Sequence, residues 1–284
     1  MNEDLIKTII SMLPGLSKRQ KQIAKYITEH YDKAAFMTAS RLGQAVGVSE
    51  STVVRFAMEL GFEGYPQLQK SLQEMIRNRL TAVQRMEITD EQLGNGDILE
   101  KVLMMDIDKI RRTIEETSRT EFQSSIDALD NARVIYIMGV RSTFSLANFI
   151  AFYFNQVFED VRLVTSSAVS EVFDQILNIN EDDVFIGLSF PRYSKPTVLA
   201  MEFAKDKGAT TIAITDSATA PVSEFADIRL YARSDMTSFV DSLVAPMSLI
   251  NALIVAVGIK NQDKLTEKYK ELEEIWTKHE VYAK

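Results

Sequence analysis

Small hydroxyl residues and cationic side chains gather in three short segments of the second half of the chain. Gly139 to Thr143 reads GVRST, Ser189 to Lys195 reads SFPRYSK, and Thr215 to Ser217 reads TDS. Hydroxyls and free backbone N–H groups at the start of a helix form a cradle for an anion, and a cation can complete the neutralisation of a phosphate. The candidates for this cation are Arg141, Arg192 and Lys195. The same residue types also serve as ordinary helix caps and solvated surface charges.

Each hydroxyl-rich segment follows a short apolar run of the kind that forms buried strands. The runs expected to be strands are Val134–Met138, Val161–Val164, Val184–Leu188, Thr211–Ile214 and Ile228–Tyr231. Helices are expected between them, including Phe144–Phe158 and Pro196–Lys207, and a long amphipathic helix is expected before them over Ile98–Thr117. This alternation predicts a three-layer α/β/α domain with a five-stranded, mainly parallel sheet. Ligands bind such sheets at the carboxyl ends of the strands, where the hydroxyl-rich segments lie.

The first 80 residues show only helical periodicity, which predicts an all-α domain. Within it, residues 38–57 read TASRLGQAVGVSESTVVRFA, which predicts a helix ending near Val46, a turn at Gly47, and a second helix capped by Ser49. The side chains expected to form the buried seam are Leu42, Val48, Val53 and Phe56. This seam turns another group outward, where the second helix of a helix-turn-helix contacts base edges and phosphates. The expected DNA-binding residues are Ser49, Glu50, Ser51, Thr52 and Arg55.

This second helix resembles the recognition helix of the RpiR (also called MurR) family of sugar-responsive bacterial regulators. The family pattern is VSxSTVVRF followed by LGFxGY, and here Val48 to Phe56 reads VSESTVVRF and Leu60 to Tyr65 reads LGFEGY. The α/β half is similar to the sugar isomerase (SIS) domain that follows in that family. The resemblance implies a transcriptional regulator of sugar-metabolism genes, expected to be a repressor, that binds double-stranded operator DNA and responds to a phosphosugar effector.

Residue by residue, the resemblance places Ser142 in the first loop of the SIS domain, and Ser189 and Ser194 on its serine-rich phosphate loop. The chain departs from the family pattern at Pro191 and Arg192, which occupy the stretch where a glycine usually follows the second serine. The expected phosphosugar-binding residues are Gly139, Arg141, Ser142, Glu171, Ser189, Ser194 and Lys195.

A polar stretch, MEITDEQLGNGD over residues 86–97, separates the two halves. We therefore expect a helix-turn-helix domain over 1–80, a linker over 81–97 centred on Gly94 to Gly96, and a SIS domain over 98–284. Residues 1–80 carry 11 Lys/Arg and 8 Asp/Glu, whereas the rest carries 21 and 32, so the basic part coincides with the expected DNA-binding domain.

Recognition helices of this kind usually act in symmetric pairs, so we expect a homodimer or a higher even oligomer. The candidate dimer surfaces are the aromatic helix Phe144–Phe158 and the apolar segment Leu243–Val257. Effector binding is expected to change the spacing of the two recognition helices.

Several classes of protein are excluded by what the sequence lacks. Without cysteine the chain has no disulfide, thiolate zinc site or cysteine nucleophile, and it contains no P-loop, GxGxxG or HExxH pattern, so we expect neither cofactor nor metal. No basic leader and no uninterrupted apolar stretch of about 18 residues occurs, which predicts a cytoplasmic protein without a membrane segment.

A sugar-phosphate isomerase is the alternative, because such enzymes share the SIS domain. Isomerisation requires a base that moves a proton between adjacent carbons. The two histidines, His30 and His279, fall outside the hydroxyl-rich segments, which leaves Glu171 as the candidate base. A glutamate in the first turn of a helix also complements the helix dipole, or bonds a sugar hydroxyl in a sensor. We therefore expect no catalysis.

Overall fold

The structure is a computed structural model that describes residues 4–76, 83–86, 89, 96–234 and 240–282. The chain divides into two compact units, Met1–Gly96 with Met236–Val240, and Asp97–Asp235 with Asp241–Lys284. The first unit has one hydrophobic core, and the second has two, one on each face of its sheet.

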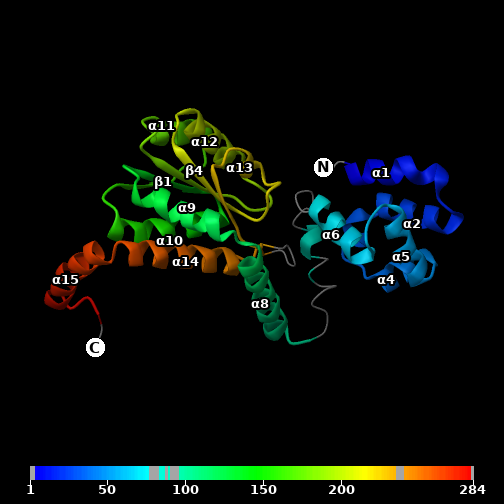
Figure 1. Ribbon diagram of the computed structural model, residues 1–284. Coiled ribbons are helices and arrows are strands. Elements are labelled where there is room, and N and C mark those ends of the chain that lie inside the picture. The colour runs from blue at the N-terminus through cyan, green and yellow to red at the C-terminus, as the bar shows by residue number, and fades with distance from the viewer. Residues whose placement is uncertain (1–3, 77–82, 87–88, 90–95, 235–239, 283–284) are drawn as a thin grey trace. The chain divides into compact units, whose positions relative to one another are not determined.

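The first unit contains helices and no strand over its described residues, as predicted, and is drawn in blue to cyan in Figure 1. Its elements are α1 (Asp4–Met12), a 3₁₀ turn (Leu13–Gly15), α2 (Lys18–Glu29), α3 (Tyr31–Ala34), α4 (Ala39–Val46), α5 (Glu50–Glu59) and α6 (Tyr65–Ile76). The side chains of Ile23, Leu42, Val53, Phe56 and Leu68 are fully buried among them. The expected seam between α4 and α5 is therefore the centre of this core, with Val48 half-buried at its edge.

Two glycines allow α4 and α5 to meet at a tight turn. A Cβ on Gly43 would lie 2.8 Å from the carbonyl oxygen of Val48, so only glycine permits this approach. Gly47 adopts φ 76°, a left-handed conformation that suits glycine. Thr38 caps α4 by accepting a hydrogen bond from the backbone N–H of Arg41. The helix-turn-helix predicted from residues 38–57 is thus present.

The second unit is built on a five-stranded sheet in the order β2-β1-β3-β4-β5. The strands are β1 (Ile135–Gly139), β2 (Val161–Val164), β3 (Val184–Leu188), β4 (Thr210–Thr215) and β5 (Ile228–Tyr231). All neighbouring pairs are parallel, which makes the sheet parallel throughout rather than mainly so. The five predicted strands match these to within a residue at each end.

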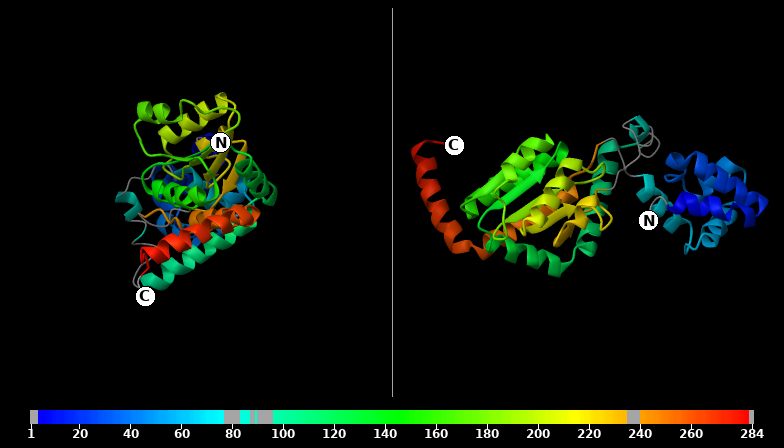
Figure 2. Two further views of the ribbon diagram at one scale, coloured as in Figure 1. Left: turned by 90° about the vertical axis from the view of Figure 1, so that its left-hand side faces the viewer. Right: turned by 90° about the horizontal axis from the view of Figure 1, so that it is seen from above.

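Helices cover both faces of the sheet, which confirms the three-layer architecture (Figures 1 and 2). One face packs against α9 (Arg119–Asp130), α10 (Ser142–Val157) and α14 (Val244–Lys260). The other packs against α11 (Val169–Ile176), α12 (Lys195–Asp206) and α13 (Pro221–Glu224). The long helix α8 (Ile98–Glu116) contacts α14. Helix α15 (Gln262–Lys278) follows α14 in the chain. Among the described residues, no single helix is long and apolar enough to cross a membrane; α14 and α15 together would pass by length and composition, with a bend of 95° between them.

Most of the expected linker lies outside the described residues, including Gly94 and Asn95. Within the described part, the Nε2 of Gln84 donates to the Oδ2 of Asp32 at 3.2 Å, so this stretch contacts the first unit. Asp97 begins the second unit and caps α8 by accepting from the backbone N–H of Glu100 at 3.1 Å. The linker boundaries at 81 and 97 remain a prediction.

Candidate functional site

The expected DNA-binding residues lie together at the start of α5. Ser49, Glu50, Ser51 and Arg55 are exposed, and Thr52 is half-buried. Their helical neighbours Val53 and Phe56 are fully buried, so the outward orientation follows from the packing of the other face. The structure therefore places all five predicted residues on the cap and the first two turns of α5, four of them exposed.

The hydroxyls at this helix start bond to one another. Ser49 has the extended backbone of an N-cap residue, as predicted, but its side chain makes no capping hydrogen bond. Its Oγ instead lies 2.9 Å from the Oγ of Ser51 and 2.8 Å from the Oγ1 of Thr52. Exposed hydroxyls beside the N-terminal N–H groups of a helix can bond phosphate oxygens or base edges, and Arg55 adds a cation one turn further on.

Tyr65 supports this surface and was missed as a functional residue by sequence reasoning. Its hydroxyl donates to the backbone oxygen of Met37 at 2.8 Å and lies 3.3 Å from that of Ala34, which ties α6 to the segment preceding α4. Burial raises the pKa of this tyrosine. The LGFEGY motif that contains Tyr65 was the available signal, but its spacing gives no indication of the partner.

In the second unit, the strand order creates a switch point between β1 and β3. The chain leaves β1 toward β2 on one side and leaves β3 toward β4 on the other. Gly139 pairs with Leu188 at the carboxyl end, so the segments that follow these two strands start side by side. They then diverge, because α10 packs on one face of the sheet and α12 on the other. A switch point of this order is where doubly wound sheets bind phosphorylated ligands.

The first of these segments has an unusual backbone. Arg141 adopts φ 60° and ψ −123°, a conformation that costs a residue with a Cβ about 1–3 kcal/mol. Thr143 holds the turn, since its Oγ1 accepts from the backbone N–H of Val140 and donates to the oxygen of the same residue, both at 2.8 Å. A Cβ on Gly139 would lie 2.5 Å from the oxygen of Thr143. Arg141 and Ser142 are consequently exposed at the start of α10.

The second segment is held by its own serines. Ser189 is 1% exposed, and its Oγ accepts from the backbone N–H of Ser194 at 3.0 Å. Ser194 caps α12 by accepting from the N–H of Thr197 at 3.3 Å, and Lys195 is exposed directly after it. Thr215, at the end of β4, donates to the backbone oxygen of Ser189 at 2.6 Å. Both predicted serines therefore shape the loop.

A buried acid that sequence reasoning did not single out lies next to this loop. Asp216 is 2% exposed, and its Oδ1 accepts from the hydroxyl of Tyr193 at 2.9 Å. The bond fixes the middle of the loop after β3 to the end of β4. The sequence had indicated this strand end through the TDS segment, which was expected to help bind an anion. In the structure, its Asp216 instead holds the neighbouring loop in place.

Glu171 lies in the first turn of α11 and is exposed. Its Oε2 accepts from the hydroxyl of Ser166 at 2.5 Å, and that hydroxyl also accepts from the N–H of Ala168 at 3.1 Å. Over the described residues, no group of three His, Asp or Glu side chains could hold a metal.

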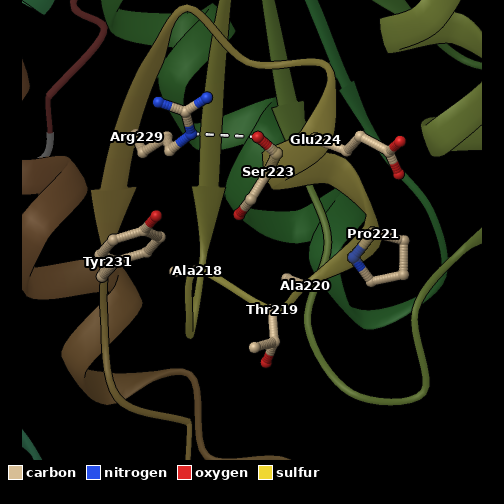
Figure 3. A pocket seen from close by; sticks show the side chains of 8 residues that line it. All are labelled: Ala218, Thr219, Ala220, Pro221, Ser223, Glu224, Arg229 and Tyr231. Carbon is tan, nitrogen blue, oxygen red and sulfur yellow. Dashed lines mark hydrogen bonds between the residues drawn. The ribbon is translucent and has the colours of Figure 1, made fainter. Parts of the chain in front are cut away.

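A surface hollow of about 510 Å³ lies beside β5 and α13 (Figure 3). It is lined by Ala218, Thr219, Ala220, Pro221, Ser223, Glu224, Arg229 and Tyr231. The Nε of Arg229 donates to the backbone oxygen of Ser223 at 3.0 Å, and burial raises the pKa of Tyr231. None of the predicted phosphosugar-binding residues lines this hollow, which is at the edge strand rather than at the switch point.

Two family models match the chain: a helix-turn-helix domain of the rpiR family over residues 3–79, and a SIS domain over residues 128–256. An HTH-type transcriptional regulator of Caldanaerobacter subterraneus subsp. tengcongensis is 24% identical, over 98% of this chain and 99% of the relative. The HTH-type transcriptional regulator HexR of Escherichia coli is 23% identical, over 95% of this chain and 93% of its own. The solved NanR protein of Vibrio vulnificus, complexed with ManNAc-6P, shares the fold over 99% of this chain and 100% of its own, with a TM-score of 0.60 at 17% identity.

Proposed function

We propose that this chain, which matches a helix-turn-helix domain of the rpiR family followed by a SIS domain, binds operator DNA through α5 and a phosphorylated sugar at the carboxyl edge of its sheet. The DNA contacts are made by Ser49, Glu50, Ser51, Thr52 and Arg55. The hydroxyl cluster and the first N–H groups of α5 bond phosphates, while Arg55 reaches base edges or phosphates. The protein binds its operator in the cytoplasm. There it acts as a repressor.

The phosphosugar proposal rests on one observation, the switch point at which the segments after β1 and β3 start side by side. There the exposed cations Arg141 and Lys195 neutralise the phosphate, and Ser142 donates to it at the start of α10. Gly139, Ser189 and Ser194 shape the two segments, and Glu171 bonds a sugar hydroxyl. NanR, which this chain resembles over its whole length, holds ManNAc-6P in its solved complex, which supports a sugar phosphate as the ligand class.

Binding of the effector is coupled to DNA through a homodimer. The connection over residues 81–97 transmits a change in the second unit to the spacing of two recognition helices. A coupling free energy of about 1–3 kcal/mol changes DNA affinity roughly 5- to 150-fold.

Catalysis is outside this proposal. An isomerase needs its base within reach of the sugar and shielded from water. Glu171 is exposed and already accepts a short bond from Ser166. Turnover of a sugar phosphate, lost in Glu171→Gln, is the result that favours the isomerase instead.

Two variants test the division between the sites. Arg55→Ala lowers affinity for DNA from upstream of the protein's own gene by about 10- to 100-fold and leaves phosphosugar affinity unchanged, because one base-contacting arginine contributes about 1–3 kcal/mol. Arg19→Ala removes an exposed cation from α2 and is the matched control.

Ser142→Ala lowers phosphosugar affinity and leaves DNA affinity unchanged. It also leaves thermal stability unchanged, because the Ser142 hydroxyl makes no hydrogen bond within the described residues. A thermal-shift screen of hexose, pentose and amino-sugar phosphates identifies the ligand first. The proposal fails if both variants change both affinities, or if neither changes any.

A further inference from the structure

Helix α14 is uncharged over its whole length up to its last residue. From Val244 to Ile259 it carries no Asp, Glu, Lys or Arg. One side packs on the sheet through buried residues such as Ile250 and Leu253, yet Val255 is 51% exposed and Ile259 is 68% exposed on the other side. Soluble proteins bury helices that are apolar all round, so the outer side of α14 requires a cover.

The outer side of α14 is complementary to itself. Its exposed residues before Lys260 are Val244, Ser248, Asn251, Ala252, Val255 and Ile259. At 100° per residue they form one stripe about 100° wide. The exposed positions are spaced symmetrically along the helix on either side of the point between Asn251 and Ala252. An antiparallel copy therefore places Val244 against Ile259, with the small Ala252 at the crossing, where two helices must approach closely.

Two further helices project past this stripe, one from each end of α14. In Figures 1 and 2, α8 and α15 both extend away from the sheet, on the side of α14 that faces away from it. The Oγ of Ser242, just before α14, donates to the Oδ1 of Asp106 on α8 at 2.6 Å, which fixes α8 at the N-terminal end. We call the outer side of α14 together with α8 and α15 the bracket face.

Of the two projecting helices, α8 carries apolar side chains without a cover, and α15 is covered only in part. On α8, Leu99, Leu103, Ile107 and Ile114 lie on one side and are 47–70% exposed. On α15 no residue is buried: Leu265, Tyr269, Leu272 and Trp276 recur at helical spacing and are half-buried, with the hydroxyl of Tyr269 bonded to Gln156 of α10, and Ile275 is 46% exposed. Helices in proteins gain most of their stability from packing an apolar face, so α15, which buries none of its residues within this chain, is expected to pack further against a partner.

We propose that the bracket face binds a second copy of this chain around a twofold axis between Asn251 and Ala252. Because α8 and α15 leave opposite ends of α14, the antiparallel arrangement brings α8 of one copy against α15 of the other. Three helices, each about 25–28 Å long, offer a face large enough for the roughly 800 Å² that each partner buries in a specific interface. This inference rests on the homodimer of the proposed function and names its interface.

Light scattering of the full chain tests the proposal. Wild type is expected at twice its mass of 32.1 kDa. Val255→Glu places a charge in the stripe, weakens the dimer by about 100-fold or more, and yields the monomer mass at micromolar concentration. Val169→Glu, on α11 at the opposite face of the sheet, is the matched control and leaves the dimer intact.

Cross-linking locates the axis, since the chain has no native cysteine. Ala252→Cys is expected to form a covalent dimer under mild oxidation, whereas Val169→Cys is not. A dimer that Ala252→Cys fails to cross-link and Val255→Glu leaves intact overturns this interface but leaves the proposed function standing. A wild-type monomer that sediments with phosphatidylcholine vesicles overturns both the interface and the homodimer, and assigns the stripe to a membrane.

Discussion

Arg141 carries the clearest sign of a functional constraint in the second unit. A positive φ at a residue with a Cβ is costly, and such conformations persist where the surrounding structure enforces them, often at binding sites. Here the enforcing contacts are the two bonds between Thr143 and Val140. The strained turn exposes the arginine at the switch point, where a phosphate would need it.

Replacing this arginine separates strain from binding. Arg141→Gly is expected to raise the free energy of unfolding by about 1 kcal/mol, because glycine accepts the positive φ. It should weaken phosphosugar binding about tenfold or more through the loss of a charge-assisted bond. Chemical denaturation and calorimetric titration measure the two effects.

Arg141→Ala is the matched control, since alanine loses the charge but keeps the strain. It should weaken binding to the same extent without the gain in stability. Unchanged phosphosugar affinity in both variants would remove Arg141 from the site.

At this scale the sequence predicted residue types better than residue contacts. Gly47 forms the turn that was predicted for it, because a left-handed turn is a local feature of the chain. The sequence placed Ser189 in the loop but did not predict that its buried hydroxyl accepts from the backbone N–H of Ser194. That contact depends on the path of the chain between the two residues. The strain at Arg141 left no trace in the sequence.

Among the elements, the junction of β1 and α10 positions the phosphate site most directly. Gly139 ends the strand so close to the helix that a Cβ would lie 2.5 Å from the backbone oxygen of Thr143, which no side-chain rotation relieves. Gly139→Ala is therefore expected to lower the stability of the second unit by about 1–3 kcal/mol and to abolish phosphosugar binding. Denaturant titration followed by near-UV circular dichroism checks the first effect.

Gly258→Ala is the matched control inside the same unit. Its added Cβ would meet only the Cδ2 of Leu265 at 3.5 Å, an ordinary contact, and alanine favours a helix interior by about 0.5–1 kcal/mol. Equal effects of the two substitutions would contradict the close approach at Gly139.

The elements themselves were largely readable from the sequence, because apolar periodicity reports burial and each strand here is short and buried. Three strands, β2, β3 and β5, coincide with their predicted bounds. The strand order was not predicted, since periodicity does not reveal which strands pair. It is the order that makes the segments after β1 and β3 neighbours, so the geometry of the site became visible only in the structure.

In the whole molecule, regulation by a sugar requires the DNA-binding site and the phosphosugar site to influence one another. An effector can change DNA affinity only if it binds the DNA-competent and the DNA-incompetent arrangements with different affinities. Thermodynamic linkage then demands that DNA changes the affinity for the effector by the same factor. A dimer formed through the bracket face, as proposed above, would let one change in the paired second units move both recognition helices together.

The most direct test is a reciprocal titration with the phosphosugar identified by thermal shift. Fluorescence anisotropy gives the affinity for upstream DNA at low salt with and without the sugar, and calorimetry gives the affinity for the sugar with and without DNA. Control of DNA binding by the sugar predicts that both affinities change by the same factor, within roughly 5- to 150-fold. A protein that binds its sugar without any change in DNA affinity, or that ignores the DNA altogether, would contradict it.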